Sequence, residues 1–220
     1  MIDEVKKVLI AKQDKGYQNF TSTLTPNKKN ILGVRIPEIR NIAKAINQEN
    51  QLVFLDENDF SYLELELIQA ILIGQIKDIA LALTYADAFL PVIDTWNTCD
   101  LFCGSFKLTK KYQKIVWKWL GHHQTSTNPM TLRVIMVMML LYFLNNDYID
   151  KVLDKLEIIH ADDYYFKMGK AWLLAEMTVK YPTKSLTYLE RKDMDPQIKK
   201  MAIRKIKDSF RISKTIKDNL

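Results

Sequence analysis

Trp96 and Asp100 stand four residues apart in the segment DTWNTCDLFCGSFK, so a helix would place both side chains on one face, about one turn apart. Cys103 and Lys107 continue the same stripe. Aspartate and lysine are seldom buried without a partner, so this stripe makes a poor core face and a plausible wall of a site. In the alternative interpretation, Trp96 packs at the edge of the core and Asp100 points to water.

Arg133 is the one charged residue in the segment MTLRVIMVMMLLYF. It falls in the first turn of the predicted helix, where the helix dipole disfavours a cation by about 0.3–1 kcal/mol. A carboxylate such as that of Asp100, or a phosphate from a ligand, would offset this cost through charge-assisted hydrogen bonds. The alternative is that the side chain of Arg133 reaches solvent from the end of its helix.

Trp172 lies in the segment DDYYFKMGKAWLLAEM, with Tyr165 seven residues before it and Glu176 four residues after it. Gly169 belongs to the same predicted helix. A glycine inside a helix costs about 1 kcal/mol relative to alanine, which points to a close approach at this position. The approaching group is either a backbone or ligand, or a neighbouring helix that needs the space.

Basic side chains gather in two places. Residues 180–220 contain 12 Lys/Arg and 5 Asp/Glu, which accounts for the net charge of +6 on the whole chain. Such surfaces suit phosphate contacts that fix position without reading sequence, although a lysine-rich helix face is often only solvated. The first set forms a stripe on the penultimate predicted helix and consists of Lys200, Arg204, Lys207 and Arg211. The second set contains no acidic residue and consists of Lys107, Lys110, Lys111, Lys114 and Lys118.

The spacing of other residue types excludes several chemistries. No two of the six glycines are closer than 17 residues, whereas phosphate-binding loops need at least two within six residues, so we expect no nucleotide cofactor. The histidines and cysteines show no metal-ligand spacing, so we expect no metal and no cofactor: His122, His123, His160, Cys99 and Cys103. No serine lies in a nucleophile-elbow context.

The chain has the features of a cytoplasmic protein. Its first 20 residues carry charge throughout and lack the apolar core of a secretion signal. Two cysteines four residues apart favour free thiols over a disulfide framework. The longest apolar run, residues 134–144, is too short to span a bilayer. We therefore expect a cytoplasmic protein that is not embedded in a membrane.

Apolar periodicity runs along almost the whole chain, which predicts an all-α protein with a single domain over residues 1–220. Short connections favour antiparallel helix pairs that stack into a curved α–α superhelix, or solenoid, with degenerate repeats. Residues 21–30, TSTLTPNKKN, are expected to form a loop. The predicted helices cover residues 2–20, 37–48, 59–74, 77–90, 92–105, 107–120, 129–144, 147–159, 163–180, 183–191, 196–208 and 213–219.

The sequence resembles the HEAT-like-repeat DNA alkylation-repair glycosylases, the AlkD family. The resemblance covers nearly the whole chain in order, and six segments together are more specific than any one of them. They are ILGVRIPEIRNIAKAI at 31–46, LELIQAILIG at 65–74, IDTWNTCDLFC at 93–103, PMTLRVIMVMMLLYF at 129–143, YYFKMGKAWLLAEM at 164–177 and IKKMAIRKIKDSFRIS at 198–213.

The resemblance implies a curved helical domain that wraps duplex DNA and excises cationic alkylpurines such as 3-methyladenine and 7-methylguanine without extruding the base. It assigns catalysis to Asp100, Trp96 and Trp172, and a backbone phosphate to Arg133. The expected partner is double-stranded DNA with alkylated purines, bound by a monomer. Further expected DNA contacts are Lys107, Lys110, Lys111, Lys200, Arg204, Lys207 and Arg211.

A second hypothesis rests on residues 21–30. Active members of the family resembled here carry a short helix that enters the DNA minor groove, directly ahead of the GVR-like segment. A loop in this place would favour an inactive paralogue that serves as a weak DNA-binding or protein-interaction module.

Overall fold

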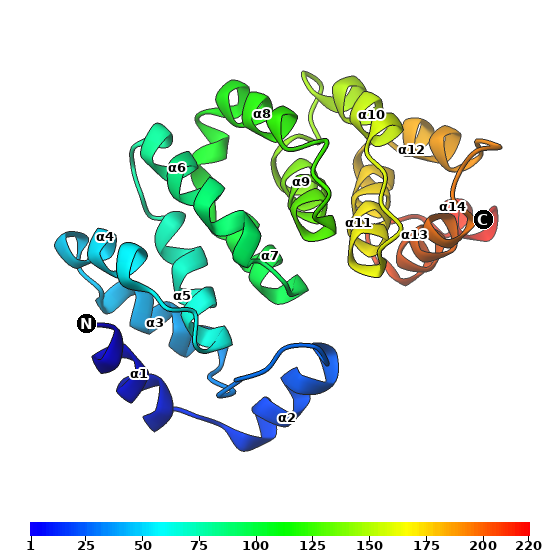
Figure 1. Cartoon of the computed structure of the whole chain (residues 1–220). Helices are drawn as coiled ribbons and strands as arrows, with labels where there is room; N and C mark the ends of the chain where they lie inside the picture. The colour runs from blue at the N-terminus through cyan, green and yellow to red at the C-terminus, as the bar shows by residue number, and fades with distance from the viewer. The chain divides into compact units, whose positions relative to one another are not determined.

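The computed structural model describes all 220 residues, Met1–Leu220, and contains only helices and their connections (Figure 1). There are 14 α-helices and two short 3₁₀ helices, η1 and η2. This confirms the predicted all-α, solenoid-like class. The chain divides into two compact units, unit 1 (Met1–Tyr112) and unit 2 (Gln113–Leu220). The prediction of one domain stays a prediction.

Unit 1 is built around α5, in which every residue is buried. This helix packs against α3, α4, α6 and α7 of the same unit (Figure 1). Side chains of Asp14, Asn47, Asp78 and Thr95 cap the starts of α2, α4, α6 and α7. The elements are α1 (Ile2–Ala11), α2 (Lys15–Leu24), α3 (Ile36–Ala45), α4 (Gln48–Glu57), α5 (Leu63–Ile73), α6 (Ile79–Phe89), η1 (Leu90–Val92), α7 (Trp96–Ser105) and η2 (Lys107–Lys110).

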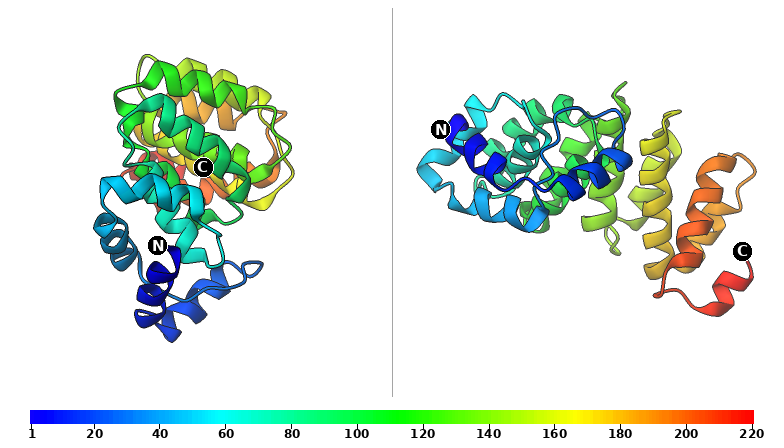
Figure 2. Two further views of the ribbon diagram at one scale, coloured as in Figure 1. Left: turned by 60° about the vertical axis from the view of Figure 1, so that its left-hand side comes forward. Right: turned by 90° about the horizontal axis from the view of Figure 1, so that it is seen from below.

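Unit 2 has α11 as its central helix, packed against α9, α12 and α13. The views in Figure 2 show α9 and α11 side by side. The middle of α9 is apolar on all sides and is buried, as expected for a helix surrounded by others. The elements are α8 (Gln113–His122), α9 (Pro129–Tyr142), α10 (Ile149–Ile158), α11 (Tyr164–Lys180), α12 (Pro182–Leu189), α13 (Pro196–Asp208) and α14 (Lys214–Asp218).

The N-terminal region differs from its prediction. The single helix expected over residues 2–20 is two helices, because the side chain of Asp14 accepts the backbone N–H of Tyr17 at 2.9 Å and starts α2. The loop expected over residues 21–30 is wrong for its first four residues, since α2 continues to Leu24. The remaining six residues, 25–30, form the expected connection and lead to the segment that begins at Ile31.

Two further differences from the predicted helices are a missed helix and a divided one. Sequence periodicity did not predict α4, whose polar first turn is capped by Asn47. The helix expected over residues 107–120 is the 3₁₀ helix η2 followed by α8.

No helix is both long enough and apolar enough to cross a membrane.

Candidate functional site

Helix α7 carries Trp96 as its first residue and Asp100 one turn later. Thr95 caps this helix by accepting the backbone N–H of Thr98 at 3.4 Å. Both Trp96 and Asp100 are half-buried, and both line a mainly apolar hollow of about 280 Å³ in unit 1. The structure thus brings these two predicted site residues together, and we call this cavity the Trp96 hollow.

Helix α2 forms another side of the Trp96 hollow, through Tyr17, Phe20 and Leu24. Phe20 is 58% exposed and Leu24 is 42% exposed, so this helix presents apolar side chains to solvent. The indole N–H of Trp96 donates a hydrogen bond to the backbone oxygen of Leu24 at 3.2 Å. This bond fixes the indole ring against the C-terminal end of α2.

Glu64 on α5 binds the backbone of residues 32–34, in the connection that follows α2. Its carboxylate, which is 1% exposed, accepts the backbone N–H groups of Leu32, Gly33 and Val34 at 2.7–3.2 Å. Gly33 has a φ of +84°, and a Cβ there would lie 2.4 Å from the backbone oxygen of Asp14. The segment therefore packs directly on the first turn of α2, and only glycine fits at this position.

Lys28, Glu66 and Asp94 form a second anchor between α2 and α7. The ammonium group of Lys28 pairs with the buried carboxylate of Glu66 and lies 2.8 and 2.9 Å from the two carboxylate oxygens of Asp94, two residues before Trp96. The hydroxyl of Thr98 donates to Glu66 at 3.3 Å. Burial raises the pKa of Glu66 to about 7, against the opposing effect of Lys28.

Sequence reasoning missed Glu64 and Glu66 as positioning residues. A signal for them exists, because these two acids lie two residues apart in the apolar run LELELIQAILI. Burying a carboxylate is costly unless it accepts hydrogen bonds or pairs with a cation. Their partners, Leu32 to Val34 and Lys28, lie 30 to 38 residues earlier in the chain. No local pattern connects the two regions.

Arg133 on α9 is 3% exposed, so the alternative in which it reaches solvent is wrong. Its Nη1 donates to the backbone oxygen of Tyr165 at 2.8 Å. A Cβ added to Gly169 on α11 would lie 3.2 Å from Cγ of Arg133. Gly169 therefore makes room for a side chain from the neighbouring helix, which is the second of the two explanations considered for this glycine.

Trp172 on α11 is half-buried and lines an open hollow of about 440 Å³ in unit 2. Lys205, Phe210 and Arg211 line the same cavity, which we call the Trp172 hollow. Arg211 does not lie on the penultimate helix as expected, because α13 ends at Asp208. Its guanidinium instead pairs with the carboxylate of Glu176 on α11.

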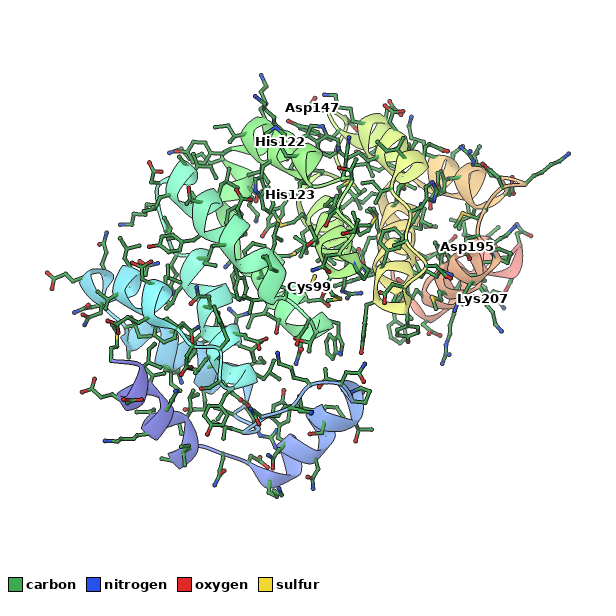
Figure 3. All side chains as sticks on the ribbon, viewed as in Figure 1. Cys99, His122, His123, Asp147, Asp195 and Lys207 are labelled. Carbon is green, nitrogen blue, oxygen red and sulfur yellow. The ribbon has the colours of Figure 1, made fainter.

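The remaining predicted DNA contacts are exposed. On α13, Lys200, Arg204 and Lys207 point to solvent while Ile198 and Ala202 are buried, and Figure 3 labels Lys207 on this helix. The predicted contacts of unit 1 are exposed as well: Lys107 and Lys110 on η2, and Lys111 directly after it.

Cys103 is fully buried, so the predicted stripe from Trp96 to Lys107 does not form one wall. Cys99, labelled in Figure 3 on α7, is also fully buried, and both cysteines carry free thiols. No group of three or more His, Cys, Asp or Glu side chains is arranged to hold a metal ion.

Comparisons with known proteins agree with the architecture and with the sequence resemblance. Among solved structures, the chain is similar to a predicted DNA alkylation repair enzyme from Enterococcus faecalis, with a TM-score of 0.71 and 13% identity, over 87% of this chain and 95% of that one. No curated protein matches. Residues 3–206, which include every predicted site residue except Lys207 and Arg211, match the family described as DNA alkylation repair enzyme. The chain belongs to this family.

Proposed function

We propose that this protein is a DNA N-glycosylase that excises cationic alkylated purines, of the 3-methyladenine and 7-methylguanine type, from duplex DNA without extruding the base. It acts as a monomer in the cytoplasm. The observation that carries the proposal is the Trp96 hollow, in which a carboxylate and an indole lie together beside the exposed apolar face of α2. Membership of the DNA alkylation repair enzyme family supports it.

The proposed reaction needs one carboxylate and no general acid. The bond between C1′ of the deoxyribose and the purine nitrogen breaks, and its electron pair leaves with the base and neutralises the positive charge that alkylation created. Water then adds to C1′ and releases a proton to solvent, which gives the free base and an abasic site. The Asp100 carboxylate stabilises the oxocarbenium-like charge on the sugar and orients the water.

We assign to Trp96 and Trp172 the stabilisation of the cationic transition state. The face of an indole ring attracts a nearby cation by about 0.5–2 kcal/mol. The hydrogen bond from Trp96 to Leu24 holds the ring of Trp96 in one orientation, so the enzyme does not have to order it during the reaction.

We assign contacts with DNA backbone phosphates to Arg133 and to exposed basic side chains. The hydrogen bond from Arg133 to Tyr165 also fixes α9 against α11, the helix that carries Trp172. The further phosphate contacts are basic residues that solvent can reach. These are Lys107, Lys110, Lys111, Lys200, Arg204, Lys207 and Arg211.

The observations favour this activity over the hypothesis of an inactive paralogue. That hypothesis rests on a loop over residues 21–30, whereas α2 continues to Leu24 and only residues 25–30 connect it to the GVR-like segment. Phe20 and Leu24 are exposed on α2 beside Trp96, in the position where an apolar element that enters a groove of DNA would be useful.

The test is release of 7-methylguanine from methylated duplex DNA, measured by chromatography of the freed bases. We expect release by the wild type and a loss of about 100-fold or more in Asp100→Asn, because the variant lacks the charge that stabilises the transition state. Asp147→Asn is the matched control, since Asp147 is exposed and labelled in Figure 3 on the connection before α10. The absence of any release by wild-type protein in excess over DNA would refute the proposal.

A further inference from the structure

Phe210 is the most exposed large apolar side chain of the protein. Its relative exposure is 103%, whereas six of the other eight phenylalanines are buried. It lies in the connection between α13 and α14. An aromatic ring held fully in water forfeits the free energy that burial would give it, so its exposure calls for an explanation.

The exposure of Phe210 does not come from a loose segment, because the residues on both sides are anchored. The next residue, Arg211, pairs with Glu176 on α11, and its backbone N–H donates to the hydroxyl of Ser209 at 3.3 Å. Ile212 is buried, with 6% exposure. The backbone is therefore fixed at residues 209–212 and holds the ring of Phe210 outward.

The surroundings of Phe210 are basic. Its ring lines the Trp172 hollow together with Lys205 and Arg211, while Lys207 is exposed on the last turn of α13. Lys214 and Lys217 follow on α14. Two carboxylates, those of Asp208 and Glu176, also line this cavity, and Glu176 is paired with Arg211. With Asp218 on α14 there are three acids and five cations in this region, so its net charge is positive.

We propose that Phe210 is a DNA-contacting residue that buries its ring against the sugar and base edges of the strand bound along the basic face of α13. A polyanion accounts for the lysines and arginine, and the sugar and base edges account for the apolar ring between them. Proteins that bind through the minor groove frequently use an apolar side chain in this way, next to basic residues that contact phosphates. The proposal rests on the proposed function only in taking duplex DNA as the ligand.

The test is the dissociation constant for a fluorescein-labelled duplex that carries one stable abasic-site analogue, measured at several salt concentrations. We expect Phe210→Ser to raise Kd about tenfold and to leave the salt dependence unchanged, because the ring neutralises no phosphate. Lys207→Gln should also weaken binding, but it should change the salt dependence and lower the slope of log Kd against log salt by about one. Phe210→Trp should restore binding.

Ile158→Ser is the matched control, because Ile158 is 59% exposed in unit 2 and lies outside the Trp172 hollow. Since Phe210 is fully exposed, Phe210→Ser should unfold at the wild-type temperature. The inference is overturned if Phe210→Ser binds as tightly as Ile158→Ser, or if wild-type protein binds no duplex. If the wild type binds DNA and depends on Phe210 but releases no alkylated base, the proposed function fails and this inference stands.

Discussion

Replacing Glu66 with glutamine should remove a pH dependence from the stability of the protein. Burial raises the pKa of Glu66 from 4.5 to about 7, and the groups that face it are Lys28, Asp94 and Thr98. The folded protein therefore binds more protons than the unfolded chain between these two pH values. The free energy of unfolding should fall as pH rises through this interval.

The expected size follows from the shift. Each pKa unit corresponds to about 1.4 kcal/mol, so ionisation of buried Glu66 should cost the wild type about 3 kcal/mol once the pH is above about 7. In Glu66→Gln the amide keeps a hydrogen-bonding group next to Lys28 and does not titrate. The difference in unfolding free energy, wild type minus variant, should therefore decline by about this amount from low to high pH.

Urea unfolding followed by circular dichroism between about pH 5 and pH 8 measures this difference. All other titratable groups occur in both proteins, so their contributions cancel in the difference. A difference that stays constant, or that increases with pH, would show that Glu66 is not held in the protonated form by burial.

Two other substitutions test the packing of each unit. Gly33→Ala should destabilise the protein by about 3 kcal/mol, because alanine is strained at a φ of +84° and its Cβ would overlap the backbone oxygen of Asp14; thermal unfolding measures this, and Gly104→Ala, with open space around the new methyl group, should unfold no lower than wild type. Burial lowers the pKa of Lys170 to about 8, so the free energy of unfolding of the wild type should rise by about 3 kcal/mol between about pH 8 and 10.5. Lys170→Met should abolish this rise, and equal pH profiles of the two proteins in urea unfolding would contradict the prediction.

Local sequence pattern was sufficient for the helices of unit 2 from α9 onward and for the two residues that share the Trp96 hollow. The four-residue spacing of Trp96 and Asp100 holds in α7 because a helix fixes which side chains share a face. The helix predicted over residues 196–208 matches α13 at both ends, since Asp195 caps a helix with proline in its first turn.

Tertiary contacts decided what the pattern missed. Residues 21–24 look like a loop because threonine and serine are weak helix formers, yet Thr21 is buried and the exposed apolar face of α2 lies beside Trp96. Arg133 donates a hydrogen bond to the backbone oxygen of Tyr165, which lies 32 residues later in the chain. These arrangements depend on partners distant in sequence, which no window of residues reveals.

The burial of the two cysteine thiols affects how readily alkylating agents can react with the protein. Sulfur is the most readily methylated nucleophile among side chains once it is ionised and accessible. Cys99 and Cys103 flank Asp100 in the sequence but have no surface in contact with water. In the folded DNA alkylation repair enzyme both thiols are therefore shielded from reagents that methylate DNA.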